Sequence, residues 1–338
     1  MENKKTGAQT FVLCNPPSIS GHANVVGEKE GQGPLKNSFD VISIDDTFGE
    51  RSWEKAEVEM QKQALTMALT KAKQTPSILD FLFAGDLLNQ CISAGYAARN
   101  TGIPFFGLYG ACSTMGESLS LAALLLDGGF GEWGAAVTSS HFCSAERQYR
   151  APLEYGGQRT PTSQWTATAA GAVVLAKNGE GPYVTHVTPG CIRDKGIKDA
   201  NNMGAAMAWA AYDTISQHLK DTNRSTSYYD LIITGDLGKL GMEIVIDLFA
   251  EDGIDITPNY TDCGVLLFDL KEQDVHCGAS GCGCSASVLT GYLLNGMRAG
   301  QWNNILFCTT GALHSPTALG QGESIPGICH AVAISTCK

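Results

Sequence analysis

The stretch Tyr109-Gly110-Ala111-Cys112-Ser113-Thr114-Met115-Gly116-Glu117 is the most informative part of this chain. An apolar run over 104–108 precedes it and an amphipathic run follows, which predicts a strand, a turn of small residues and then a helix. A cysteine at a helix start feels the positive end of the helix dipole and unpaired backbone amides, which favour the thiolate form. The same amides bind a carboxylate or an oxyanion. This turn therefore suits either a nucleophile or an anionic ligand.

The composition is that of an ordinary folded protein. The chain has 338 residues, of which 43% are hydrophobic and 17% charged, enough for one large α/β domain or two fused halves. Its formal net charge of -11 argues against a nucleic-acid partner, because phosphate binding needs clustered Lys and Arg. The longest apolar stretch, 119–126, is too short to span a membrane, and residues 1–9 are too polar for a secretory signal. We therefore expect a cytoplasmic protein, or one bound peripherally to a membrane, with reduced cysteines.

Strands and helices alternate along the whole chain. The expected strands cover 10–14, 78–84, 104–108, 134–139, 171–176, 183–188, 229–234, 305–309 and 328–335. The expected helices cover 53–73, 88–100, 113–126, 203–219, 239–251 and 282–297. We expect a polar loop up to residue 38 and an irregular insert over 142–168. Such alternation is typical of parallel strands with helices on both faces of the sheet.

Two turns rich in glycine and cysteine stand at matching places in the chain. Cys112 and Cys282 each open a predicted helix, and a tryptophan-marked loop follows 21 residues (112 to 133) and 20 residues (282 to 302) later. The repeat predicts two similar halves, 1–180 and 181–338, related by a pseudo-two-fold axis. Helices would then lie between two sheets and on both outer faces, giving an α/β/α/β/α order of layers.

Other motifs resemble the thiolase and ketoacyl-synthase superfamily. There, a strand leads into Gly-Ala-Cys-Ser at a helix start, and a glycine-rich segment precedes the last strand of the first half, as in TATAAGAVVL at 166–175. The resemblance covers nearly the whole chain, 10–335, and implies a thiolase-like five-layer fold. It also matches Cys112 to the acyl-accepting cysteine of the superfamily, with the amides of Cys112 and Ser113 as part of an oxyanion hole.

Within this superfamily the chain most resembles the stage V sporulation protein AD family of spore-forming bacteria. Besides the Cys112 turn, the resemblance is carried by FAGDLLNQ at 83–90, TSSHF at 138–142, EYGGQRTPTSQW at 154–165 and TGDLG at 234–238. It implies a soluble partner of a membrane complex that moves dipicolinic acid (pyridine-2,6-dicarboxylate) into the developing spore, at the spore inner membrane. It further implies a homodimer, and a ligand binder rather than a proven enzyme.

Two residues of the second half bear on whether any chemistry takes place. Condensing enzymes of the superfamily carry a His or Asn after the strand that corresponds to 229–234, where this chain has Asp236. An ionised Asp repels an enolate and cannot donate to an oxyanion, so Asp236 argues against condensation. His276, just before Gly-Ala-Ser-Gly at 278–281, resembles the thiolase His that precedes such a turn. A base for Cys112, a cation for a ligand carboxylate and a packing role all remain open for it.

Further residues are predicted to contact the ligand. His314, in Gly311-Ala312-Leu313-His314, takes the place of the C-terminal glycine-rich loop of the superfamily. A flat dianion such as dipicolinate calls for bidentate Arg or amide donors and an aromatic wall. The insert supplies Arg147, Arg150, Arg159 and Trp165. The predicted ligand-binding residues are Cys112, Ser113, Asp236, His276, His314 and Arg159, with Cys112 and His276 at the ancestral catalytic positions.

Cys277, Cys282 and Cys284, together with His276, raise the question of a zinc site. Their spacing lacks the paired Cys-x-x-Cys of zinc knuckles, and a tight turn before a helix uses small residues anyway. We therefore predict no metal and no cofactor. The predicted function is dipicolinate binding in sporulation; the alternative is a thiolase-like acyltransferase that uses Cys112 as its nucleophile and His276 as base.

Overall fold

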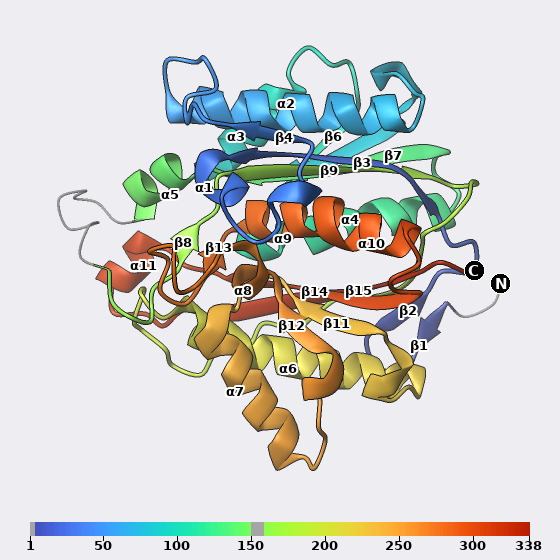
Figure 1. Ribbon diagram of the computed structural model, residues 1–338. Coiled ribbons are helices and arrows are strands. Elements are labelled where there is room, and N and C mark those ends of the chain that lie inside the picture. Colours follow the sequence, from blue (N-terminus) through green and yellow to red (C-terminus); the bar gives the residue numbers. More distant parts are fainter. Residues whose placement is uncertain (1–3, 150–158) are drawn as a thin grey trace.

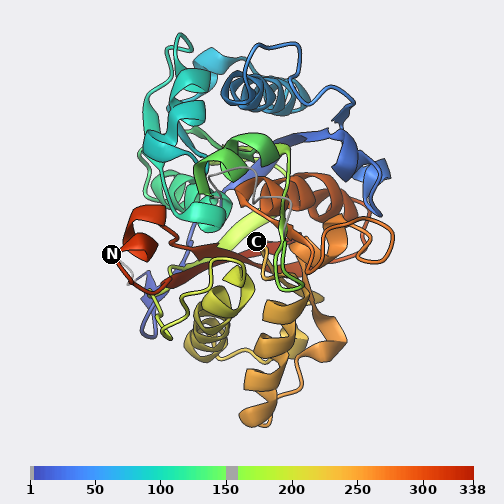
Figure 2. The same cartoon turned by 90° about the vertical axis from the view of Figure 1, so that its left-hand side faces the viewer.

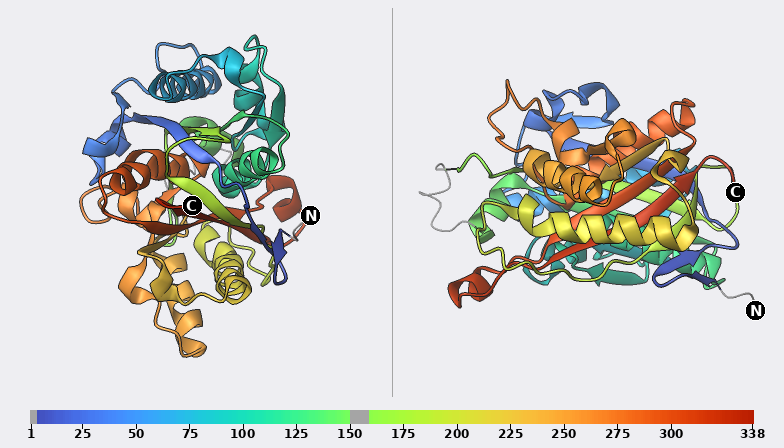
Figure 3. Two further views of the ribbon diagram at one scale, coloured as in Figure 1. Left: turned by 90° about the vertical axis from the view of Figure 1, so that its right-hand side faces the viewer. Right: turned by 90° about the horizontal axis from the view of Figure 1, so that it is seen from below.

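The computed structural model, which describes residues 4–149 and 159–338, stacks helices and sheets in five layers (Figure 1). Helices cover the upper sheet, lie between the two sheets, and cover the lower sheet. From top to bottom these are α2 (Trp53–Lys71) and α3 (Ile92–Ala98), then α4 (Thr114–Asp127), α9 (Cys282–Val288) and α10 (Leu294–Arg298), then α6 (Met203–Thr222) and α7 (Gly238–Glu251). Seen from below, α6 and α7 lie across the lower sheet (Figure 3). The predicted α/β/α/β/α fold is confirmed.

The two sheets have the same strand order. The upper sheet runs β6 (Phe105–Leu108), β5 (Phe81–Gly85), β7 (Trp133–Ser140), β9 (Ala169–Ala176) and β3 (Ser18–Gly27). The lower sheet runs β12 (Tyr260–Asp262), β11 (Leu231–Thr234), β14 (Asn304–Ala312), β15 (Gly327–Ser335) and β10 (Tyr183–Thr188). In each sheet the last of these strands along the chain, β9 or β15, is antiparallel to both neighbours. The topology therefore repeats as the sequence does, while a division between 180 and 181 stays a prediction.

The sheets join at one corner and enclose the middle helices. β10 pairs with β3 through Tyr183 and Ser18, which links the two strand orders into one path. Because α4 lies between the sheets, its side chains Met115, Leu119 and Leu126 retain no exposed surface. A helix enclosed in this way is apolar around most of its circumference, as the composition of α4 indicates.

Short elements connect the layers. They are β1 (Lys5–Thr6), β2 (Thr10–Val12), α1 (Glu28–Gly31), β4 (Val41–Ser43), α5 (Phe142–Tyr149), β8 (Trp165–Thr166), α8 (Cys263–Leu267), β13 (Ala279–Ser280) and α11 (Pro316–Gly320). β8 and β13 form a separate parallel pair that sets Thr166 opposite Ser280. Figure 2 looks onto the end of the molecule where α5 and α11 lie.

The expectation of a polar loop up to residue 38 is wrong, because Ser18–Gly27 forms β3. His22 and Asn24 of this strand are buried, and each has a hydrogen-bond partner outside the strand. His22 Nδ1 lies 2.6 Å from the Thr290 carbonyl oxygen, and the Asn24 backbone amide donates to Asp40 Oδ2 at 3.0 Å. Buried polar groups are stable when they are hydrogen-bonded, so low hydropathy did not prevent a central strand here.

The structure corrects two further elements of the first half. Within the insert expected to be irregular, Phe142–Tyr149 forms α5. The helix expected over 88–100 begins only at Ile92, because Gln90 and Cys91 have left-handed φ angles of 61° and 50°.

Candidate functional site

Cys112 lies in a 3-10 turn between β6 and α4 that short polar side chains stabilise. The Ser113 hydroxyl donates to the Gly110 carbonyl and the Thr114 hydroxyl to the Ala111 carbonyl, each at 2.7 Å. Ala111 has a left-handed φ of 51°, which turns the chain sharply just before the cysteine. The backbone amide of Ser113 donates to the Gly110 carbonyl, and that of Thr114 to the Ala111 carbonyl.

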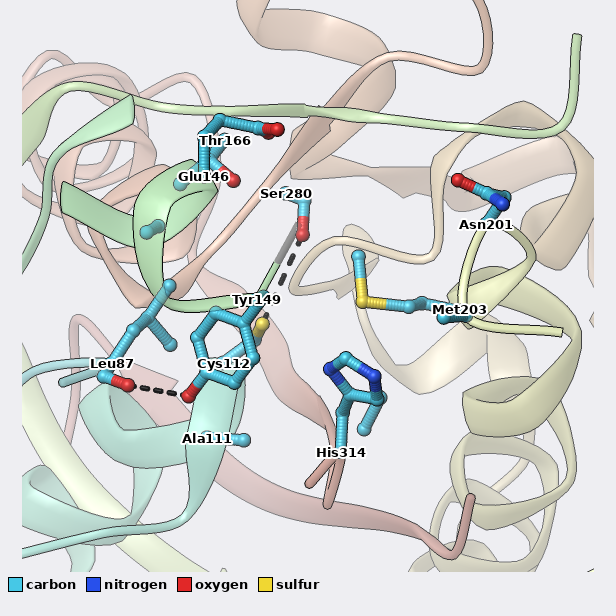
Figure 4. Close-up of a pocket in the computed structure, with 13 residues that line it drawn as sticks. Leu87, Ala111, Cys112, Glu146, Tyr149, Thr166, Asn201, Met203, Ser280 and His314 are labelled. Atoms are coloured by element: carbon cyan, nitrogen blue, oxygen red, sulfur yellow. Dashed lines mark hydrogen bonds between the residues drawn. The ribbon is translucent and has the colours of Figure 1, made fainter. Parts of the chain in front are cut away.

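A pocket opens above Cys112, and residues from both predicted halves line it (Figure 4). Those before residue 180 are Leu87, Ala111, Cys112, Ala145, Glu146, Tyr149 and Thr166. Those after it are Ala200, Asn201, Met203, Ser280, Ala312 and His314. The cavity has a volume of about 60 Å³. Apolar side chains with a few convergent polar groups are what a small-molecule site is made of.

The Cys112 thiol is held in its protonated form. Cys112 is 5% exposed, and its Sγ lies 3.9 Å from the Ser280 hydroxyl oxygen. Burial raises the pKa of this thiol well above its usual value, and the nearby Asp236 carboxylate raises it further. The expectation that the helix start favours a thiolate is therefore wrong for the unliganded chain, because burial and a like charge outweigh the helix dipole.

Asp236 follows β11 and lies behind Ser280. It has no exposed surface; its Oδ2 accepts hydrogen bonds from the Gly281 amide at 2.8 Å and the Ser280 hydroxyl at 3.3 Å. Its Oδ1 accepts from the Thr310 hydroxyl at 2.8 Å. Burial raises the pKa of Asp236 to about 6 although these donors favour the ionised form. Cys112, Ser280 and Asp236 thus form a short polar row that runs inward from the pocket.

The structure does not bring His276 to Cys112. The His276 Nδ1 lies 2.6 Å from the Thr160 carbonyl oxygen, and its Nε2 lies 3.1 Å from Asp274 Oδ1. Both ring nitrogens are thus engaged outside the pocket, whose described lining does not include this residue. The geometry gives no support to a Cys112–His276 pair.

Arg147 and Arg159 of the insert also lie outside the described pocket lining. Arg159 donates to Asp274 Oδ2 at 2.6 Å and packs over the Trp165 ring, 4.8 Å from its centroid. Arg147 pairs with Glu54 and has about half of its side chain exposed. Arg150 and the Glu154–Gln158 part of the family motif lie outside the described residues. The described pocket lining contains neither Lys nor Arg.

Of the predicted ligand residues Ser113 and His314, only His314 lines the pocket. Ser113 is fully buried beneath Cys112, where its carbonyl accepts from the Thr309 hydroxyl at 3.0 Å. His314 lines the pocket, with its ring centroid 5.2 Å from that of Tyr149. Leu87 and Tyr149 stand on one side of the pocket, and Met203 and His314 on the other (Figure 4). Of the predicted ligand residues, the structure therefore brings Cys112 and His314 to the pocket wall and Asp236 directly behind it.

The cysteines considered for zinc point in different directions. The thiols of Cys277, Cys282 and Cys284 donate to the carbonyls of Pro161, Ser139 and Gly235, respectively. Within residues 4–149 and 159–338, no group of three or more His, Cys, Asp or Glu side chains is placed to hold a metal ion. All 12 cysteines of the chain are free thiols.

Sequence reasoning missed several residues of the pocket wall, among them Tyr149, Asn201, Met203 and Ser280. Ser280 had a usable signal, since it belongs to the Gly-Ala-Ser-Gly turn beside His276. Asn201 and Met203 had none, because the loop before α6 carries no motif and reaches the pocket only through the packing of the two halves.

Comparison with known proteins assigns the family. The family model for stage V sporulation protein AD (SpoVAD) matches residues 7–335. The stage V sporulation protein AD of Bacillus subtilis (strain 168) is 44% identical over 329 residues, covering 97% of each chain. This chain belongs to the stage V sporulation protein AD family. The resemblance inferred from the sequence motifs is confirmed, and with it an assignment to sporulation.

Solved structures support the fold of this family member. The 3-oxoacyl-[acyl-carrier-protein] synthase III of Aquifex aeolicus VF5 superposes with a TM-score of 0.59 at 12% identity, covering 94% of this chain and 99% of that one. Cerulenin-bound OleA of Xanthomonas campestris superposes with a TM-score of 0.60 at 14% identity, covering 95% and 96%. At such identities the likeness establishes the thiolase-like fold alone. Among the described residues, no helix is both long and apolar enough to cross a bilayer.

Proposed function

We propose that this chain binds dipicolinate in the pocket above Cys112. Together with membrane proteins of the same transport complex, it would assist the uptake of this acid into the developing spore. The observation that carries the proposal is the state of the thiol at the pocket floor. Cys112 is buried, and burial together with the neighbouring Asp236 carboxylate raises the pKa of its thiol well above the usual value, so the thiol stays protonated and is a poor nucleophile. A pocket of this kind is better suited to holding a ligand than to forming a covalent intermediate.

The groups around the pocket match a flat aromatic acid. Tyr149, Met203 and Ala312 provide aromatic and apolar surface. The Asn201 side chain and the Ser280 hydroxyl are neutral hydrogen-bond donors for carboxylate oxygens. These contacts support dipicolinate as the ligand, and the family assignment supports its place in sporulation.

Calorimetric titration tests the proposal directly. Dipicolinate is expected to bind saturably, and isophthalate, which lacks the ring nitrogen, at least about tenfold more weakly. His314→Ala is expected to weaken binding about tenfold because it removes a pocket wall, whereas His276→Ala is expected to leave it unchanged. Absence of binding by the correctly folded chain would refute the proposal.

The fold is also compatible with a second function, acyl transfer. A cysteine at a helix start on the floor of a pocket is the feature that an acyltransferase would use, with Cys112 as nucleophile. Covalent labelling of Cys112 by an acyl-coenzyme A, with turnover lost in Cys112→Ala, would favour acyl transfer. Binding of dipicolinate by Cys112→Ala, with no acyl labelling of the unmodified chain, would favour the binder.

We also propose that the chain forms a homodimer through β6. This strand ends the upper sheet, and Phe105 and Phe106 are 37% and 51% exposed. An edge strand with apolar side chains is a template for pairing with another strand, and two copies related by a two-fold axis satisfy each other.

A further inference from the structure

The described lining of the pocket holds neither Lys nor Arg to meet an anionic ligand. Besides Cys112 and Tyr149, its titratable side chains are Glu146 and His314. Behind the wall, the Asp236 carboxylate lies one hydrogen bond from Ser280, whose hydroxyl faces the pocket. A carboxylate bound at Ser280 would therefore stand close to a second carboxylate, that of the fully buried Asp236. Two carboxylates this close repel each other, so keeping both ionised is energetically unfavourable.

Among residues 4–149 and 159–338, the titratable groups that interact with Asp236 are thiols and one further carboxyl group. They are Cys112, Asp262, Cys263, Cys282, Cys284 and Cys329. Asp262 brings a further negative charge, and the thiols are neutral when protonated. Within the described chain, Asp236 accepts hydrogen bonds from Gly281, Ser280 and Thr310, and hydrogen bonding to the Cys112 thiol also lowers its pKa.

We propose that Asp236 takes up one proton when a carboxylate ligand fills the pocket, which makes Asp236 the residue that sets the pH dependence of binding. This inference rests on the proposed binding function. The proton comes from solvent and converts the carboxylate to the neutral acid, so that ligand binding and proton binding are coupled.

The hydrogen bonds allow this exchange without moving the backbone. In the unliganded site the Ser280 hydroxyl donates to Asp236 Oδ2. Once Oδ2 carries the proton, Asp236 donates to the Ser280 oxygen, and the Ser280 hydroxyl turns its hydrogen toward the ligand carboxylate. Oδ2 keeps a lone pair for the Gly281 amide, and Oδ1 keeps the Thr310 hydroxyl. The proton therefore removes a repulsion and supplies a donor to the ligand.

Burial already holds the pKa of Asp236 at about 6 in the unliganded chain. Asp236 is therefore mostly ionised at pH 7.5, and a ligand charge nearby raises its pKa further. Linkage then predicts that the association constant for dipicolinate falls up to about tenfold for each pH unit above 6. Below that pH Asp236 is already protonated, and the dependence on it levels off.

Calorimetry on the unmodified chain measures the effect without any substitution. Dipicolinate is titrated at pH 7.5 in phosphate and in Tris, whose ionisation enthalpies differ, and the difference in heat gives the number of protons taken up. We expect close to one proton, and an association constant that falls between pH 6 and 8. Equal heats in both buffers together with a flat pH profile would overturn the inference and leave the binding function intact. No binding at any pH would refute both.

Two variants identify the group that takes up the proton. Asp236→Asn is expected to bind dipicolinate with no proton uptake and a flat profile over pH 6 to 8. Glu146→Gln removes the other carboxyl group of the pocket and is expected to retain the uptake. If uptake persists in Asp236→Asn, or disappears only in Glu146→Gln, the assignment to Asp236 is wrong. An infrared difference spectrum of the unmodified chain on binding should gain the carbonyl band of a protonated carboxylic acid, which tests the proposal even if Asp236→Asn does not fold.

Discussion

The same three residues, Gly-Asp-Leu, follow the corresponding strand of each sheet but do different work. Gly85-Asp86-Leu87 comes at the end of β5 and Gly235-Asp236-Leu237 comes after β11. In both turns the aspartate has no exposed surface. Asp86 stays local, accepting the Leu88 amide on Oδ1 and the Ala94 amide on Oδ2, each at 2.8 Å. Its role is to shape the chain that follows it.

Asp236 reaches across the molecule instead. The amides of Leu237 and Gly238, which its own carboxylate would be placed to accept, are bound by Asp262 at 2.8 and 2.9 Å. Asp236 is thereby free to contact Gly281 and the Ser280 hydroxyl beside the pocket. Asp236 can contact the pocket wall because Asp262 binds the local backbone amides that the aspartate of the first turn binds itself. Identical local sequence thus does not imply identical function.

The two outer strands of the sheets differ in a similar way. β6 carries Phe105 and Phe106 at its exposed edge, whereas Tyr260 and Asp262 of β12 are buried. Both strands end their sheets, but only the first half exposes apolar side chains at that edge. This asymmetry is why the proposed dimer uses the first half.

The largest expected effect is on stability, when each aspartate is replaced by asparagine. Asp86→Asn should lower the free energy of unfolding by about 3 kcal/mol. Both oxygens of Asp86 accept a backbone amide, and the side-chain NH2 group of asparagine would replace one oxygen and leave that amide without an acceptor. Asp236→Asn should cost no more than about 1 kcal/mol, since the Thr310 hydroxyl can turn to accept from the new amide group. Urea unfolding at pH 7 measures both. Equal losses would mean that the two turns are equivalent after all.

The next effect concerns the open edge. Phe106→Lys places a charge in the proposed interface and should weaken self-association about a hundredfold, as measured by analytical ultracentrifugation. Phe130→Lys is the matched control, because Phe130 is 76% exposed in the loop between α4 and β7. A chain that is monomeric at all concentrations before substitution would contradict the dimer.

A smaller effect is expected on the reactivity of Cys112. Asp236→Asn removes the charge that helps to raise the pKa of the thiol, so alkylation by iodoacetamide at pH 8 should be about fivefold to tenfold faster. Peptide mass spectrometry resolves this site from the exposed Cys337, which serves as an internal reference. An unchanged rate would show that Asp236 does not act on the thiol and that burial alone protects it.

The smallest effect is on the pH dependence of stability. Glu57 is buried and accepts hydrogen bonds from Ser139 at 2.8 Å and from Ser144 of α5 at 3.1 Å. Burial, and then the charge of Asp86, raise the pKa of Glu57 above its unfolded value. Such a group stabilises the fold at low pH and loses this contribution as pH rises through its folded pKa. Between pH 5.5 and 8, the Tm of Glu57→Gln should therefore fall by a few degrees less than the Tm of the unmodified chain.

The control for this change is Glu59→Gln on the same helix, whose carboxylate contacts Gln63 at the surface. The histidines His22, His186, His218 and His330 have pKa values lowered by desolvation and act in the opposite direction, losing stability as pH falls. Because all variants contain these histidines, their contribution to the pH dependence of Tm is the same in each and does not affect the difference between variants. An unchanged pH profile in Glu57→Gln would mean that Glu57 does not change protonation in this range.

Much of the fold could be predicted because strands and helices leave periodic patterns. The alternation along the chain and the repeated Cys112 and Cys282 turns led to five layers, which the structure has. β3 was missed because its buried polar residues are satisfied by partners distant in sequence, such as Thr290 for His22. α5 was missed because nothing local distinguishes its helical run from the rest of the insert.

The sequence by itself determined the family, the layered fold and the position of Cys112 at a helix start, because these depend on local patterns and motifs. The tertiary structure decided which residues meet. It engaged His276 with Thr160 and Asp274, and it brought Ser280 and Asp236 to Cys112. It also decided the charge state of the thiol, since burial and a neighbouring carboxylate are properties of the packed halves. Those distances and that exclusion of water arise only when the two sheets close around the middle helices.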